Sequence, residues 1–246
     1  MDAGRDGNRL RQLSLATKVK IVASTGFHLQ KYYRRDHWLF TAELQKVKEL
    51  FVRELTEGLT ECLNESETVL AGQIKAACPA LKQDWPERLM IGAAYAAQIT
   101  GSAVHVHTEK GSGAEGIVAF FQKAGLDPRR LILAHMDKRI DKKLHKQLIE
   151  EGVLLEYDTF SRAKYDPDNR VWPLLFDLLD AGLEDGIAIA NDLAYKNEWQ
   201  AYGGNPGLAS LPNIILPRLR VSGIDEEVIE KLTHRNIANR LARFKK

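Results

Sequence analysis

The sequence predicts an α/β protein whose parallel sheet is covered by helices, of the (β/α)₈ barrel type. Six short aliphatic runs alternate with segments of helical periodicity, and no low-complexity linker interrupts them. Six strands could also form an open doubly wound sheet, so a third observation is needed. Polar residues recur at the C-terminal ends of four predicted strands, namely Lys75, His107, His135 and Asp192. Functional residues gathered at the ends of several strands are typical of barrel enzymes.

The predicted strands are mostly continuous apolar runs of ordinary strand length, and the one at residues 104–109 alternates apolar and polar residues. The strands are expected at residues 19–24, 69–77, 104–109, 131–137, 153–158 and 186–192. Helices are expected at residues 5–17, 41–59, 87–100, 114–124, 142–151 and 172–181, followed by two C-terminal helices, the second at 237–244. In the second helix Leu44, Val47, Phe51 and Leu55 recur at helical spacing. Gly101 is placed to end the third helix.

Composition predicts one globular domain over residues 1–246. Hydrophobic residues make up 44% and charged residues 28%, and 35 basic residues nearly balance 33 acidic ones. This balance argues against a dedicated nucleic-acid binder, which concentrates basic charge on one face. No run approaches the roughly 20 apolar residues of a membrane span, and the first residues lack an apolar signal core. With only Cys62 and Cys78 to pair, we expect a cytoplasmic protein.

The strand at residues 104–109 carries two imidazoles, His105 and His107, on the same face. A buried histidine there needs a partner, either a hydrogen-bonding neighbour or a metal, and for the isolated pair the former is favoured. The other strand ends change the balance. Imidazoles and a carboxylate suit a divalent ion such as zinc. A buried lysine such as Lys75, with a lowered pKa, could react with carbon dioxide, and the resulting carbamate could also bind the metal.

Short motifs lie in a distinctive order along the chain. They are Gly26 onward, Gly72-Gln73-Ile74-Lys75, Val106-His107-Thr108, Ala134-His135-Met136-Asp137 and Ala190-Asn191-Asp192. In this order they resemble the phosphotriesterase-like family of the amidohydrolase superfamily, over essentially the whole chain.

The resemblance implies a binuclear metallohydrolase on a (β/α)₈ barrel. Lys75 would be the carbamylated bridge between two divalent ions, zinc first, with manganese or cobalt as alternatives. His107 and His135 would bind one metal. Asp192 would bind the other and take a proton from the metal-bridging hydroxide. His105 is expected to be a hydrogen-bonded barrel residue.

One departure from the family concerns metal ligands. The family opens with a strand that bears its own His-X-His pair, and nothing of that kind precedes Gly4. Counting back from Asp192 as the eighth strand makes residues 19–24 the third. We therefore expect an incomplete barrel that lacks the first two strands, an N-terminally truncated form with poor catalysis.

A second departure concerns the substrate. Where true phosphotriesterases carry a proton relay after the sixth and seventh strands, this chain has Lys138 and Thr159. The pattern His-X-X-Lys followed by Ser161-Arg162-X-X-Tyr165 resembles the branch that hydrolyses phosphorylated sugar lactones. A lysine, an arginine and a phenol suit a phosphate dianion. The predicted substrate-binding residues are Lys138, Arg162, Tyr165, Tyr32 and, by its position after the third strand, His28.

The leading hypothesis is metal-dependent hydrolysis of a phosphorylated sugar lactone. The alternatives are an organophosphate triester hydrolase and a truncated, non-catalytic remnant that needs a partner chain. The expected partner is a small-molecule substrate, without nucleic acid or membrane, in a monomer or a homodimer. His145 falls on a charged helix face and is expected to be exposed.

Overall fold

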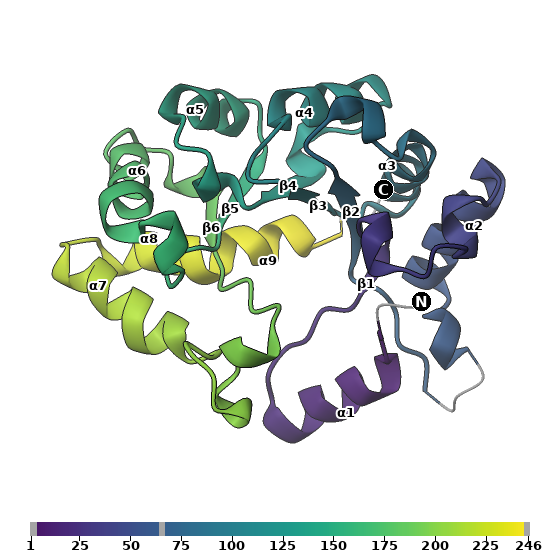
Figure 1. Cartoon of the computed structure of the whole chain (residues 1–246), viewed down its shortest axis with the longest axis horizontal. Helices are drawn as coiled ribbons and strands as arrows, with labels where there is room; N and C mark the ends of the chain where they lie inside the picture. The colour runs from purple at the N-terminus through teal and green to yellow at the C-terminus, as the bar shows by residue number, and fades with distance from the viewer. Residues whose placement is uncertain (1–3, 64–66, 244–246) are drawn as a thin grey trace. The chain divides into compact units, whose positions relative to one another are not determined.

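The computed structural model describes residues 4–63 and 67–243, which contain six strands and the helices that alternate with them (Figure 1). The strands are β1 Ser24–Gly26, β2 Gln73–Cys78, β3 Val104–Thr108, β4 Leu131–Ala134, β5 Leu154–Tyr157 and β6 Ile187–Ile189. The helices are α1 Gly7–Thr17, α2 Leu44–Thr56, α3 Glu87–Thr100, α4 Ala114–Lys123, α5 Lys142–Glu150, α6 Trp172–Leu179, α7 Leu216–Val221, α8 Glu226–Glu230 and α9 Asn236–Leu241. The strands follow one another in the sheet in chain order. The predicted parallel α/β class is confirmed.

The chain divides into two compact units. The first contains the described residues of 1–109, 113–132 and 241–246, and the second contains 110–112 and 133–240. No helix within the described ranges is long and apolar enough to cross a bilayer.

In the first unit, β1, β2 and β3 pair in parallel. Gly26 ends β1 with a φ of +104°, and a Cβ there would lie 1.9 Å from the Lys75 carbonyl oxygen, so the close approach of β2 requires glycine. Helices α2 and α3 pack together (Figure 1). Gly92 permits their contact, because its Cβ would lie 2.5 Å from Val47 Cγ1.

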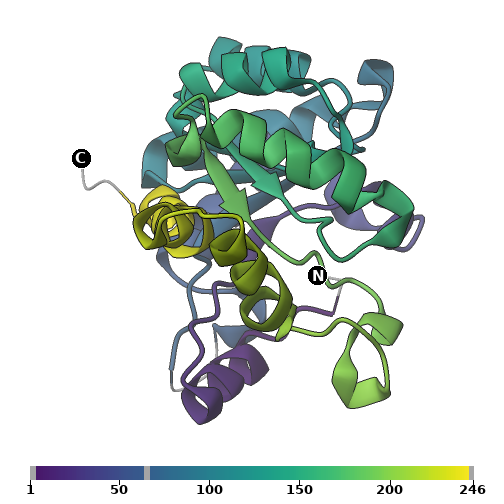
Figure 2. The ribbon, with the colours of Figure 1, turned by 90° about the vertical axis from the view of Figure 1, so that its left-hand side faces the viewer.

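In the second unit, β5 and β6 pair in parallel, and α5 packs on β5 and against α6 (Figures 1 and 2). The C-terminal helix is fastened to β6 by a side-chain amide. Asn236 donates hydrogen bonds to the carbonyl oxygens of Ile187 at 2.8 Å and Glu184 at 2.7 Å. These contacts hold β5 and β6 between α5 and the C-terminal helix.

Several predicted bounds were wrong. The run at 19–24 is a strand only from Ser24, where pairing with Gln73 begins, and Val19 and Val22 are exposed. Branched side chains favour a strand, but a strand also needs a neighbour to pair with. The second C-terminal helix, predicted at 237–244, begins earlier and ends earlier. A short π-helix at Lys231–Arg235 joins α8 to α9, and α9 ends at Leu241. Its predicted last residue, Phe244, lies outside the described residues.

A buried ion cluster joins the start of α1 to α2 and β1. The Arg5 guanidinium donates to Glu54 at 2.6 and 2.9 Å, to Glu61 at 2.6 and 2.7 Å, and to the Ser24 carbonyl oxygen at 2.8 Å. The Glu54 side chain is only 2% exposed. Burial alone would raise the pKa of Glu54, but hydrogen bonds from Arg5 and Thr25 lower it to about 2.

We predict that Arg5→Ala lowers the free energy of unfolding by about 3–5 kcal/mol, because it leaves the buried Glu54 carboxylate without its cation. Arg220→Ala, which breaks an exposed pair with Glu226, should cost less than about 1 kcal/mol. Denaturant unfolding of both variants measures the difference. Equal losses would mean that the buried cluster contributes no more than a surface pair.

Candidate metal and substrate site

The end of β4 turns sharply at His135. This residue has a φ of +68° and begins a short 3₁₀ turn, Met136–Lys138. The turn directs His135 and Lys138 to the carboxyl end of the second unit's strands, and both side chains are only 7% exposed. A buried cation and a buried imidazole need anionic partners.

Asp158, at the end of β5, supplies one of these partners. Its Oδ2 atom lies 2.6 Å from His135 Nδ1 and accepts the His135 backbone N–H at 3.1 Å. A carboxylate at Nδ1 favours the tautomer that carries its proton there. In that tautomer Nε2 carries the lone pair that can bind a metal.

Asp192, after β6, supplies the other carboxylate. Its Oδ2 atom lies 3.7 Å from His135 Nδ1, 3.7 Å from Lys138 Nζ and 3.1 Å from Arg162 Nη2. The donor atoms of His135, Asp158 and Asp192 all lie within 4.8 Å of one another. One imidazole and two carboxylates fit a divalent cation. Because Asp158 is held to Nδ1, a metal at this cluster would be bound by His135 and Asp192, with Asp158 supporting His135.

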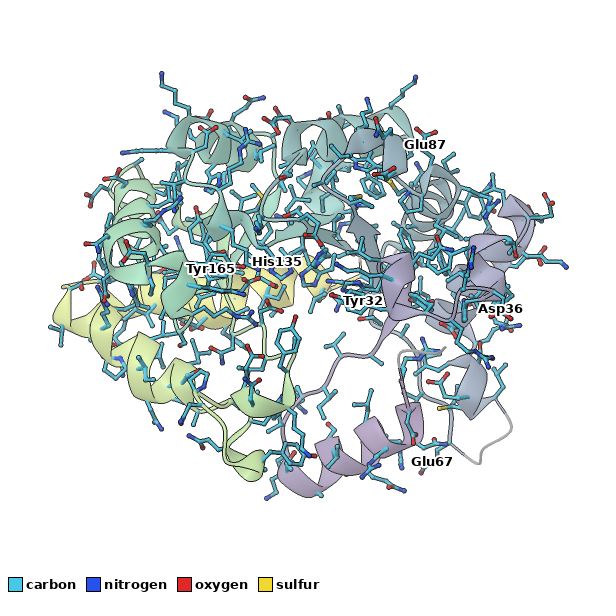
Figure 3. All side chains as sticks on the ribbon, viewed as in Figure 1. Tyr32, Asp36, Glu67, Glu87, His135 and Tyr165 are labelled. Atoms are coloured by element: carbon cyan, nitrogen blue, oxygen red, sulfur yellow. The ribbon has the colours of Figure 1, made fainter. Side chains whose placement is uncertain are left out.

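The two cations border this cluster. Lys138 Nζ lies 3.6 Å from Asp158 Oδ1 and 5.3 Å from the centre of the Tyr165 ring. Arg162 also pairs with Glu198 at 3.2 Å. Figure 3 shows His135 and Tyr165 at this edge. The structure therefore brings together the predicted residues His135, Asp192, Lys138, Arg162 and Tyr165.

The remaining predicted residues lie in the first unit. Lys75 stands opposite His105 in the β2–β3 register, and His107 stands opposite Ala77, so all three polar side chains share one face of these strands. The His28 ring lies 4.8 Å from that of His107 and 4.7 Å from that of Tyr32. The Tyr32 side chain is half exposed. This unit thus has its own cluster at the ends of β1 and β3.

Comparison with known proteins identifies the chain. The model of the phosphotriesterase family matches residues 1–240. The chain belongs to the phosphotriesterase family. It is accordingly a metal-dependent hydrolase, because the family consists of divalent-metal enzymes.

Relatives within the phosphotriesterase family carry different names. A phospho-furanose lactonase of Mycoplasmopsis synoviae is 30% identical over 93% of this chain and 69% of its own length. An N-acetyltaurine hydrolase of Mus musculus is 26% identical over 94% of this chain and 68% of its own length. The crystal structure of a lactonase from Listeria monocytogenes superposes with a TM-score of 0.87, at 25% identity, over 98% of this chain and 79% of that one.

This family member also has supporting residues that sequence reasoning missed. One is Asp158; another is Asp137, whose Oδ2 accepts hydrogen bonds from the backbone N–H groups of Asp158 at 3.0 Å and Thr159 at 2.7 Å. Burial and the neighbouring Asp158 raise the pKa of Asp137 to about 7. Burial also raises the pKa of Asp158 well above its ordinary value. Both acids are the last residues of predicted strands, and that position was the available signal.

His145 corrects another expectation. Predicted to be exposed, it is fully buried in α5, and its Nδ1 atom hydrogen-bonds the Tyr157 hydroxyl beneath the site. The charged residues around it in the sequence hid its position on the inward face. Burial lowers its pKa to about 4.

We predict that His145 contributes stability that is lost as the pH drops from about 6.5 towards 4, opposite in sign to the contribution of Asp137 with its raised pKa. Because the unfolded chain protonates His145 at an ordinary pKa and the folded chain does so only near 4, the unfolded state binds more protons in this window. The loss should approach roughly 3 kcal/mol. His145→Gln should remove this contribution and so change the slope of unfolding free energy against pH in denaturant unfolding, whereas His234→Gln, at an exposed position, should leave the slope unchanged. An unaltered slope in His145→Gln would contradict this assignment.

We also predict that Asp158→Asn weakens zinc binding about 10- to 100-fold, because the neutral amide no longer holds the His135 tautomer. Calorimetric titration with zinc measures the affinity. Asp168→Asn, which removes an exposed carboxylate paired with Arg218, is the matched control. Equal affinities in wild type and Asp158→Asn would exclude Asp158 as a support for the metal site.

Proposed function

We propose that this chain hydrolyses phosphorylated sugar lactones. The observation that carries the proposal is the pair of cations, Lys138 and Arg162, beside His135 and Asp192 at one edge. A guanidinium and an ammonium together suit a phosphate monoester dianion. Support also comes from the relative named phospho-furanose lactonase.

Two divalent ions, zinc first with manganese or cobalt as alternatives, complete the proposal. His135 and Asp192 are proposed as ligands, and the family resemblance adds His107 and a carbamylated Lys75. When bound, such ions acidify water and polarise the lactone carbonyl. The residues' own roles are distinct. Asp158 orients His135, while Lys138 and Arg162 hold the phosphate with the Tyr165 hydroxyl as a further donor.

Asp192 is the proposed proton carrier. As water adds to the carbonyl carbon, the carboxylate takes a proton from the attacking oxygen. When the ring carbon–oxygen bond breaks, the same proton goes to the leaving alkoxide. The products are a hydroxy acid and the regenerated carboxylate.

An organophosphate triester hydrolase is the runner-up function. A neutral triester offers no dianion to Lys138 and Arg162, whose charges would lack a substrate partner. The second alternative, a non-catalytic remnant that needs a partner chain, predicts that the purified chain binds no metal and hydrolyses neither class.

Hydrolysis rates on matched substrates test the proposal. Purified protein supplied with zinc, manganese or cobalt is assayed on phosphorylated sugar lactones, on the same lactones without phosphate and on a neutral organophosphate triester. We expect the phosphorylated lactones to show a kcat/KM at least about 10-fold higher, from charge-assisted bonds worth about 1.5–3 kcal/mol each. A preference for the triester, or equal rates on both lactones, would overturn the proposal.

Substitution of Lys138 and Arg162 provides a second test of the proposed function. Lys138→Met and Arg162→Met should each raise KM for a phosphorylated lactone roughly 10- to 100-fold and leave KM for its unphosphorylated counterpart nearly unchanged. Lys142→Met, which removes an exposed ammonium paired with Asp177, should behave as wild type on both.

A further inference from the structure

The loop at residues 193–207, after β6, is built around one glutamate. Glu198 Oε2 accepts the backbone N–H groups of Ala194 at 2.7 Å and Tyr195 at 2.8 Å, and its own carbonyl oxygen accepts the Gly207 N–H at 2.9 Å. The Glu198 backbone therefore contacts the end of the loop, and its start is held by the Glu198 side chain. This side chain is only 15% exposed.

The other oxygen of the same carboxylate faces Arg162. Glu198 Oε1 lies 3.2 Å from Arg162 Nη2, which also lies 3.1 Å from Asp192 Oδ2 and donates to the Asp192 carbonyl oxygen. All these contacts end on Nη2. Within the described part of the chain, Nε and Nη1 of Arg162 donate no hydrogen bond, so both can donate to an incoming oxyanion.

We propose that Glu198 is a positioning residue for Arg162, fixing its guanidinium for a phosphate group and coupling it to the loop at 193–207. The inference rests on the proposed function, since it names the residue that orients the arginine of the proposed phosphate site. An arginine side chain loses rotamer freedom when it binds. Held at Nη2 by two carboxylates, Arg162 has lost that freedom before phosphate arrives.

The substitution Glu198→Gln removes the negative charge that faces Arg162 but can keep the hydrogen bonds within the loop. The amide oxygen can still accept the N–H groups of Ala194 and Tyr195, whereas the amide nitrogen then faces Arg162 Nη2, donor against donor. A residue with a purely structural role in the loop would tolerate this change. A residue that positions Arg162 would not.

Two measurements test the inference on the full chain. Titration with inorganic phosphate should show about 10-fold weaker binding in Glu198→Gln. KM for a phosphorylated lactone should rise by a similar factor, with kcat within about 3-fold and KM for the unphosphorylated lactone unchanged. Glu226→Gln, at an exposed pair with Arg220, should match wild type.

A double-mutant cycle shows whether the effect passes through Arg162. Glu198→Gln should have no further effect on phosphate affinity in an Arg162→Met background, and additive losses would overturn the inference. So would a wild type that binds no phosphate, or a Glu198→Gln protein with wild-type phosphate affinity and KM. If phosphate affinity depends on Glu198 but no lactone is hydrolysed, the inference stands and the proposed function fails. A thermal melt of each variant verifies folding.

Discussion

The hydrogen bond between Asp158 and His135 is the contact on which the candidate site depends. It spans 2.6 Å, is buried, and joins the ends of β4 and β5. The Asp137 carboxylate accepts a hydrogen bond from the Asp158 backbone N–H, and Lys138 Nζ lies 3.6 Å from the Asp158 carboxylate. The orientation of the imidazole is thus set by Asp158 and Asp137, which are not among the proposed ligands, together with Lys138, which is proposed to bind the phosphate.

Charge balance explains why the edge can serve two ligands. Three acids, Asp158, Asp192 and Glu198, surround two cations, Lys138 and Arg162, in a largely buried setting. The imidazole and carboxylate oxygens suit a divalent ion, while the cations are positioned for an anionic substrate. A metal bound at His135 and Asp192 would offset the negative charge of the carboxylates. A phosphate bound at Arg162 would offset the positive charge of the cations.

The sequence predicted the alternation of strands and helices, and with it which residues end each strand. His135 and Asp192 come together for that reason, and Lys138 and Arg162 follow one turn or loop later. Glu198 could not be predicted in this way, because its contacts depend on how the loop at 193–207 folds back on itself. The buried His145 was missed because its neighbours in the chain are charged, although only one face of α5 is exposed.

The central claim is that a metal and a phosphate share the edge formed by His135, Asp192, Lys138 and Arg162. The most direct test is the ³¹P relaxation rate of inorganic phosphate added to the chain loaded with Mn²⁺, whose unpaired electrons relax only nearby nuclei. The account predicts strong enhancement that disappears in Arg162→Met. Phosphate that binds the Mn²⁺-loaded chain without enhanced relaxation would contradict it.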